Sequence, residues 1–319
     1  MKKLALFLLL FSAPLAHAEG LQDALPNPYP APEFAGVEAW LNSPPLTMQS
    51  LKGKVVLVDI WTYSCINCVR TLPHITQWNT DYRDKGLVIV GVHSPEFAFE
   101  KSQANVAAAL KKYGIQYPVA LDNNMETWKA FKNRYWPAHY LIDKQGRVVY
   151  KHFGEGNYDI TENNIRFLLG LDTQAAGQDA ATSSSGQTPE TYLGTARAKN
   201  FVGDASVLAK DEWTLSGKWD RQPDRIISAE KGSALRIRFF AGKVFLVLGS
   251  KDGKLLKATL TLNGKPLAND AGGDAPHGVL TVGQHALYEL VKQNAPAESV
   301  LEIKTEGAGL EAYAFTFGR

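Results

Sequence analysis

The sequence predicts an α/β domain followed by an all-β sandwich domain. Three features of the 319-residue chain support this. Between residues 45 and 171, short apolar runs alternate with segments of helical spacing. Residues 172–190 are rich in Ala, Gly and Ser, have little to bury, and are expected to be a linker. In residues 191–319, apolar residues recur at every second position, which is typical of strands with one buried face.

The chain begins with the pattern of a secretory signal peptide at residues 1–18. Lys2 and Lys3 precede an apolar run from Leu4 to Phe11, and the sequence Ala-His-Ala that ends at Ala18 resembles a cleavage site. The run is shorter than the roughly 20 residues that span a bilayer. We therefore expect cleavage after Ala18 and an exported, soluble mature protein in the periplasm or an equivalent compartment.

Composition and charge exclude several classes of protein. The chain is 45% hydrophobic, which is enough to form a sizeable core and argues against a disordered protein. It has 34 Lys and Arg against 32 Asp and Glu, and loss of Lys2 and Lys3 with the signal would make the two sets equal. A charge near zero gives no reason to expect nucleic acid or an anionic membrane as a partner.

The first half of the α/β domain follows a lead-in of residues 19–44. This lead-in is rich in proline, and we expect it to lie extended on a surface. The runs at 55–60 and 87–92 are almost wholly apolar, so both are expected to be strands covered on both faces of a sheet. Between them, apolar residues three or four positions apart predict a helix over 66–82.

The second half of this domain has shorter elements. Gly114 ends a helical pattern, and Asp143 to Gly146 form a turn between two alternating runs, which predicts a hairpin. Strands joined by helices, followed by a hairpin and a last helix, indicate a central sheet with helices on both sides. The expected elements are a helix at 104–113, a strand at 117–121, a helix at 124–131, strands at 137–142 and 147–152, and a helix at 159–169.

The last domain is predicted from alternation and turn signals. The alternating residues are Leu235, Ile237 and Phe239; Ala258, Leu260 and Leu262; Leu301 and Ile303; and Tyr313, Phe315 and Phe317. Four aromatic residues have flat faces that suit a sugar ring and equally suit a core: Tyr192, Trp213, Trp219 and Tyr288. The fold alone does not choose among scaffold, docking face and binding module.

The chemistry is expected at Cys65 and Cys68, the only two cysteines of the chain. A bridge between such near neighbours closes a very small loop and stabilises little, so its use lies in being made and broken. Half a zinc site and an inert bridge are the alternatives, but the histidines show no zinc-type spacing. We expect neither a metal nor a bound cofactor, because the dithiol itself carries the electrons.

The two cysteines are expected to have different roles. Cys65 follows a turn after a buried strand and lies where the next helix begins, so unpaired N–H groups and the helix dipole favour its anion. Cys68 lies within the first turn and is more covered. Cys65 is therefore the predicted nucleophile, and Cys68 the thiol that resolves the mixed disulfide.

The surroundings of this pair resemble the thioredoxin superfamily. Asp59, six residues before Cys65, matches the buried acid of that family, and Pro73 matches the proline within its first long helix. The Trp136-Pro137 pair matches its cis-proline loop. The resemblance covers most of the α/β domain and implies a thioredoxin-like fold there.

The resemblance also implies roles for the residues around the thiols. Asp59 would pass protons to and from Cys68, although an ordinary strand-end aspartate is the alternative. Pro137, in a cis bond, would present backbone polar groups to an extended substrate. Trp136 and Tyr63 would contribute to the substrate-binding surface.

A narrower resemblance is to the extracytoplasmic portion of the DipZ family. It rests on residues 61–68, on Arg70 to Pro73 after them, and on Tyr135 to Ala138. Those proteins have a TlpA-like thioredoxin domain followed by a jelly-roll sandwich that resembles carbohydrate-binding modules, and residues 188–194 look like its entry. The resemblance implies a separate membrane protein as electron donor, and by analogy a carbohydrate ligand for the sandwich.

The predicted function is that of an exported thiol–disulfide oxidoreductase that acts on protein thiols and disulfides, most simply as a reductant. The Ile66-Asn67 pair between the cysteines does not fix the reduction potential, so an oxidant or isomerase stays open. A binding module that recruits a glycan or envelope protein, with the redox domain as an accessory, is an alternative.

A thiol peroxidase of the peroxiredoxin type is the other alternative. Thr62 matches the threonine of the pattern P-x-x-x-T-x-x-C, but Val58 stands where the proline should be. The arginine that would stabilise a peroxidatic thiolate is not identified; Arg70 and Arg134 are the candidates.

Overall fold

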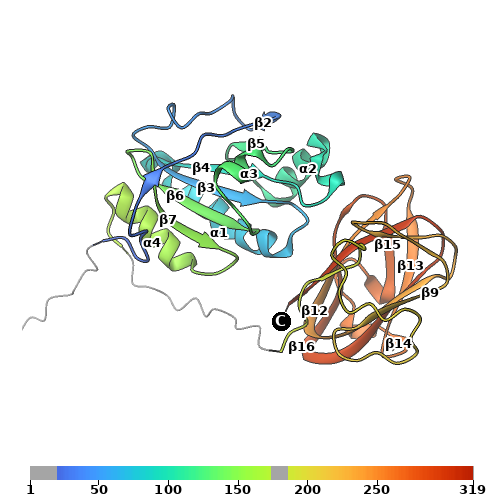
Figure 1. Ribbon diagram of the computed structural model, residues 1–319. Coiled ribbons are helices and arrows are strands. Elements are labelled where there is room, and N and C mark those ends of the chain that lie inside the picture. The colour runs from blue at the N-terminus through green and yellow to red at the C-terminus, as the bar shows by residue number, and fades with distance from the viewer. Residues whose placement is uncertain (1–19, 174–185, 319) are drawn as a thin grey trace, which may run out of the picture.

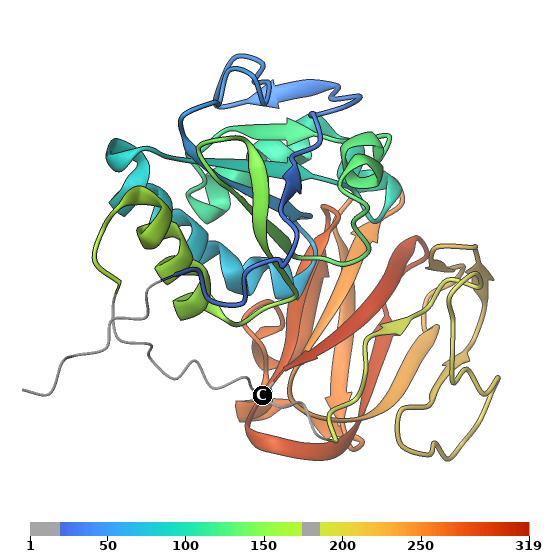
Figure 2. The same ribbon diagram turned by 60° about the vertical axis from the view of Figure 1, so that its left-hand side comes forward.

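The computed structural model describes residues 20–173 and 186–318. These residues form an α/β unit and an all-β unit that pack against each other (Figures 1 and 2). The predicted signal peptide and most of the predicted linker lie outside the described residues. No helix in the described ranges is long and apolar enough to cross a membrane.

The α/β unit is built on a seven-stranded sheet with the order β1-β7-β6-β3-β4-β5-β2. Strands β3, β4 and β5 are parallel, whereas β6 runs antiparallel to β3 and forms a hairpin with β7. Every residue of β3 is buried, as expected of a strand covered on both faces. The strands are β1 (Tyr29–Pro30), β2 (Ala39–Leu41), β3 (Val55–Trp61), β4 (Leu87–His93), β5 (Val119–Leu121), β6 (Ala138–Ile142) and β7 (Arg147–Phe153).

Helices cover both faces of this sheet, as predicted. The apolar sides of α1 (Ile66–Tyr82), α2 (Gln103–Tyr113) and α4 (Tyr158–Leu169) share one core cluster with β3 and β4. The opposite cluster packs against the short helix α3 (Glu126–Ala130). The expected helix and strand bounds agree with those observed to within about two residues at each end.

The lead-in differs from the prediction. It supplies β1 and β2, one at each edge of the sheet, and its apolar side chains cover the second face of the sheet. These side chains lie beside or between the prolines, so an extended chain can bury them without a helix. They are Leu25, Tyr29, Ala31, Phe34 and Trp40.

The second unit is all-β, which confirms the predicted class. Its ten strands form an antiparallel sheet that folds over one apolar core. Strands β12 (Ala234–Ser250) and β16 (Ala286–Thr305) pair along most of their length and run through both halves of this fold. The others are β8 (Thr191–Tyr192), β9 (Trp213–Ser216), β10 (Trp219–Arg221), β11 (Ile226–Ser228), β13 (Leu256–Leu262), β14 (Lys265–Pro266), β15 (Val279–Val282) and β17 (Leu310–Gly318).

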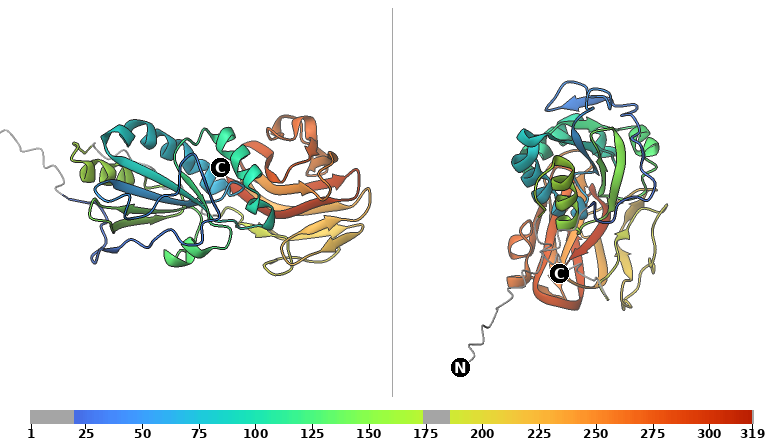
Figure 3. Two further views of the ribbon diagram at one scale, coloured as in Figure 1. Left: turned by 90° about the horizontal axis from the view of Figure 1, so that it is seen from above. Right: turned by 90° about the vertical axis from the view of Figure 1, so that its left-hand side faces the viewer.

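The two units meet beside the amino end of α1. Figure 3 shows the α/β unit and the all-β unit in contact along one side. The segment that follows β4, including the 3-10 helix η2 (Ala98–Lys101), packs its Phe97 and Phe99 against Val247 and Tyr313 of the all-β unit. This contact brings the second unit close to the predicted site.

Candidate active site

Cys65 is the N-cap residue of α1. Its backbone is extended, and its sulfur accepts the backbone N–H of Cys68 at 3.4 Å. The side chain is half-buried, so a partner can reach it. A sulfur that faces the free N–H groups at the positive end of a helix dipole is stabilised as an anion.

Cys68 is fully buried below Cys65. Burial raises the pKa of the Cys68 thiol well above its ordinary value, and the nearby Cys65 sulfur and the Asp59 carboxylate raise it further. The two sulfurs are free thiols in this structure. The half-buried Cys65 sulfur is thus suited to attack a partner, whereas the buried Cys68 sulfur keeps its proton until the second step.

Asp59 lies on β3 beneath this pair and is fully buried. Its Oδ1 is 3.3 Å from Nε2 of His139, which is 1% exposed and lies directly opposite on β6. Within the described residues, neither carboxylate oxygen accepts a hydrogen bond. The acid predicted from its spacing therefore has a basic neighbour that the sequence reasoning did not assign to it.

Pro137 lies beside the same end of β3. The Trp136–Pro137 bond is cis, and the next residue, Ala138, pairs with Ile60 on β3. Trp136 is half-buried, packs against the cluster that contains both cysteines, and donates its indole N–H to the Ser94 carbonyl at 2.9 Å. The structure thus brings Cys65, Cys68, Asp59 and the Trp136-Pro137 pair together at one end of the sheet.

Glu100 is a second buried acid that the sequence reasoning missed. It accepts the hydroxyl of Ser64, the residue before Cys65, at 2.6 Å. It also accepts the backbone N–H groups of Glu96 and Phe97 at 2.6 and 2.9 Å. Burial raises the pKa of Glu100, although the Ser64 hydroxyl opposes the rise. Glu100 therefore ties the loop of the nucleophile to the segment that contacts the all-β unit.

Tyr63 lies at the junction of the two units rather than on an open surface. It is 6% exposed, stacks on His93 and contacts Phe99. Its ring lines a cavity of about 350 Å³ between α2 and the residues from Gln284 to Leu287. A smaller cavity of about 260 Å³ lies between Ile66 and Asn67, the residues between the cysteines, and residues 187–190, Thr316 and Phe317.

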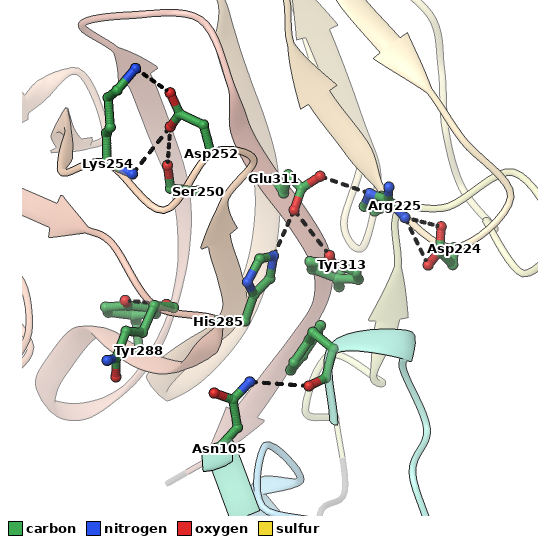
Figure 4. Close-up of polar contacts among 12 residues, drawn as sticks. Asn105, Asp224, Arg225, Ser250, Asp252, Lys254, His285, Tyr288, Glu311 and Tyr313 are labelled. Atoms are coloured by element: carbon green, nitrogen blue, oxygen red, sulfur yellow. Dashed lines mark hydrogen bonds and ion pairs between the residues drawn. The ribbon is translucent and has the colours of Figure 1, made fainter. Parts of the chain in front are cut away.

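A network of charged and polar side chains in the all-β unit orients the His285 and Tyr313 rings at this junction (Figure 4). Glu311 contacts His285 at 2.6 Å, Arg225 at 3.0 Å and the Tyr313 hydroxyl at 3.2 Å. Burial disfavours ionised Glu311, but His285 and Arg225 outweigh that effect and lower its pKa. The rings of His285 and Tyr313 then pack against Phe99, at centroid distances of 4.8 and 5.0 Å.

The structure gives less support to a peroxidase, a metal site or a sugar-binding surface than to a redox dithiol. Arg70, a candidate for stabilising a peroxidatic thiolate, pairs with Glu155 and lies over the Phe245 ring of the all-β unit. No group of three or more His, Cys, Asp or Glu within the described ranges is arranged to hold a metal ion. Trp213 is fully buried in the core of the second unit, and Tyr192 lies under Arg197 at the junction.

This fold and site define a thioredoxin-like protein with a dithiol at a helix start and a cis-proline beside it. The family described as Redoxin matches residues 28–169, and the family described as "Thioredoxin like C-terminal domain" matches residues 188–318. Both units therefore have recognised relatives.

Individual relatives agree with this class. The chain is 36% identical to Protein DipZ of Mycobacterium tuberculosis over 90% of this chain and 43% of DipZ, so it spans less than half of that protein. It is 31% identical to thiol-disulfide oxidoreductase YkuV of Bacillus subtilis, over 44% of this chain and 94% of YkuV. A solved "Thioredoxin-like Protein in the Oxidized Form" is 29% identical, with a TM-score of 0.41, over 44% of this chain and 95% of its own. The chain belongs to the family of thioredoxin-like thiol–disulfide oxidoreductases, and DipZ is its homologue.

Proposed function

We propose that the protein is an exported thiol–disulfide oxidoreductase that reduces disulfides of other proteins through Cys65 and Cys68. The observation that carries the proposal is the position of Cys65 as the N-cap of α1, with its sulfur facing the Cys68 N–H and half open to solvent. The family to which the chain belongs supports the reaction type.

The proposed reaction has two steps. The Cys65 thiolate attacks a disulfide of the partner, so one partner sulfur leaves as a thiolate and the other is bonded to Cys65. Cys68 then gives up its proton, attacks the Cys65 sulfur and forms the Cys65–Cys68 disulfide, which releases the partner with both sulfurs reduced. Asp59 is the proposed acceptor of the Cys68 proton, since it is the acid buried next to that thiol.

The substrate would lie over the cis-proline. Trp136 is fixed by its hydrogen bond to Ser94, and it lies half-exposed beside Pro137. Trp136 and Pro137 are thus suited to hold an extended segment next to Cys65. Tyr63 would contribute indirectly, because it packs on His93 and Phe99 at the junction of the two units.

The finer parts of the proposal rest on the DipZ relationship and on the sequence. They are export by the segment 1–18, a membrane thiol carrier that returns electrons to Cys65 and Cys68, and a carbohydrate ligand of the all-β unit. Reduction rather than oxidation is the proposed direction, and a reduction potential near about −270 mV would support it, whereas about −120 mV would indicate an oxidant.

The test is the reduction of an insulin-like disulfide substrate by the purified protein with a thiol donor. Cys65→Ser should reduce turnover to the uncatalysed rate. Cys68→Ser should accumulate a covalent complex with the substrate, because the second step is blocked while the first remains. Catalysis that persists in Cys65→Ser would refute the proposal.

The same variants distinguish the alternatives. If the protein is chiefly a binding module, binding to a glycan array or to an envelope extract should be strong in the wild type and unchanged in Cys65→Ser. If it is a peroxidase, it should consume hydroperoxide in a Cys65-dependent manner while reducing insulin poorly.

A further inference from the structure

Three side chains form a row across neighbouring strands below the thiols. Asp59 on β3 pairs in register with His139 on β6, and His139 pairs with His152 on β7. Side chains at paired positions project from the same face of a sheet. Figure 1 shows β3, β6 and β7 as neighbours, so the row runs from the middle of the sheet toward its β1 edge.

Burial decreases along this row. Asp59 and His139 are 0% and 1% exposed, whereas His152 is partly exposed and its Nε2 lies 3.4 Å from the Glu155 carbonyl oxygen. The two imidazole rings are nearly parallel, with centroids 6.2 Å apart. The row therefore connects the buried acid to the protein surface.

Few other titratable groups of the described residues face the Asp59–His139 pair. Of the groups that the structure describes, those that titrate and face the pair are the Cys68 thiol on α1, the Tyr117 phenol before β5, and His152. Burial raises the pKa values of Cys68 and Tyr117, so both stay neutral at ordinary pH. Burial and the facing His139 lower the pKa of His152, which keeps that ring ready to pass a proton on.

A lone carboxylate in such a site carries an uncompensated charge. If His139 is neutral, a proton that arrives on Asp59 cancels this charge, and transfer to His139 then leaves a carboxylate opposite an imidazolium, which is also neutral as a pair. Two sites for one proton make the pair a better acceptor than either group alone.

We propose that His139 is a positioning residue that acts through Asp59 by receiving the proton that Cys68 releases in the second step. Cys68 loses its proton to Asp59 as its sulfur bonds to Cys65 and the partner's sulfur leaves as a thiolate. Asp59 passes the proton to His139. The proton then leaves His139 for solvent by way of His152, the partly exposed end of the row. This rests on the proposed thiol–disulfide exchange and adds a proton path to it.

The experiment separates the two steps with dithiobis(nitrobenzoate) at stoichiometric concentration. Attack by Cys65 releases one coloured thiolate at a rate that depends on reagent concentration, and closure by Cys68 releases the second in a first-order phase. Cys68→Ser should show the first phase alone. If the wild type lacks the second phase, the proposed function fails, whatever His139 does.

His139→Gln retains a polar side chain but cannot take the proton. It should leave the first phase within about two-fold and slow the second by about ten-fold or more near pH 8. The wild-type second phase should also depend more steeply on pH than that of His139→Gln, because glutamine neither takes up nor releases a proton. His74→Gln, on α1 outside the row, is the matched control and should alter neither phase.

An unchanged second phase, or a loss by the same factor at every pH, would mean that His139 only fills space. If His139→Gln does not fold, His139→Asn takes its place, and Asp59→Asn is compared with the double variant that combines it with the His139 substitution that folds. Their second phases should agree within about two-fold, because His139 acts through Asp59, and further slowing in the double variant would overturn the proposal.

Discussion

At the scale of the residue, two buried acids flank the thiols from different directions. Asp59 lies below Cys68 with His139 Nε2 at 3.3 Å, whereas Glu100 accepts hydrogen bonds from Ser64 and two backbone N–H groups. An acid that already accepts three donors is suited to hold a loop in place. An acid without donors is suited to take a proton.

Glu100→Ala tests the structural role. It leaves the Ser64 hydroxyl, the buried N–H of Phe97 and the partly buried N–H of Glu96 without their acceptor, so we expect the free energy of unfolding to fall by about 3 kcal/mol or more. The Cys65 alkylation rate should also change, because Ser64 adjoins it. Urea unfolding and iodoacetamide kinetics measure the two effects.

Glu155→Ala is the matched control for Glu100→Ala. Its pair with Arg70 is about a third exposed on both sides, so its loss should cost less than about 1 kcal/mol. A Glu100→Ala protein that is as stable as Glu155→Ala would contradict the anchoring role.

At the scale of the element, α1 both builds the core and presents the proposed nucleophile, Cys65. Its apolar side packs under the sheet, and the backbone N–H of Cys68 in its first turn donates to the Cys65 sulfur. The residue that caps the helix is thus also the proposed nucleophile. Helix stability and reactivity are therefore linked at one position.

Substitutions at the cap should reveal this link. Serine is a strongly preferred N-cap residue and alanine is a poor one. Reduced Cys65→Ser should therefore be at least as stable as the reduced wild type and about 1 kcal/mol more stable than Cys65→Ala, with both variants inactive. Equal stability of the two variants in urea unfolding would show that Cys65 does not cap α1.

At the scale of the whole molecule, the two units share a cluster of carboxyl groups. The Tyr192 hydroxyl lies 2.7 Å from Glu96 Oε1 and 2.8 Å from Glu190 Oε2, and Arg197 also binds Glu96. The Tyr192 hydroxyl has one proton and donates it to one carboxylate. If Glu190 is protonated, it can donate to the Tyr192 oxygen while Tyr192 donates to Glu96. Burial and the nearby Glu96 charge raise the pKa of Glu190 to about 7.

This gives the contact a pH dependence of known sign. A carboxyl whose pKa is raised in the folded state favours folding below its ordinary pKa, and this contribution is lost as pH rises through the folded value. The wild type should therefore lose stability relative to Glu190→Gln between about pH 4.5 and pH 7. The protein around Glu190 limits hydration of its carboxyl group, but much of the side chain still faces solvent, so screening should keep the effect small. Thermal unfolding across this range measures it, and parallel curves for both proteins would exclude the shared proton.

Helices and strands were predictable from the sequence where the spacing of their own apolar residues is regular. The helix over 66–82 was found at its observed bounds because its apolar spacing is regular. The strand expected at 117–121 is shorter because Pro118 precedes its first paired residue and cannot donate to a ladder. The prolines of the lead-in predict an extended surface chain, and its apolar residues have no regular spacing that would predict that they cover the sheet.

The sequence by itself determined the two thiols and placed Asp59 in a buried strand, and its resemblance to the thioredoxin superfamily implied the cis-proline. Tertiary structure alone decided that His139 faces Asp59, that Glu100 holds Ser64, and that the all-β unit forms a wall beside Ile66 and Asn67. The physical reason is that strand register and packing between the two units bring together residues far apart in the chain, and no local pattern encodes those pairings.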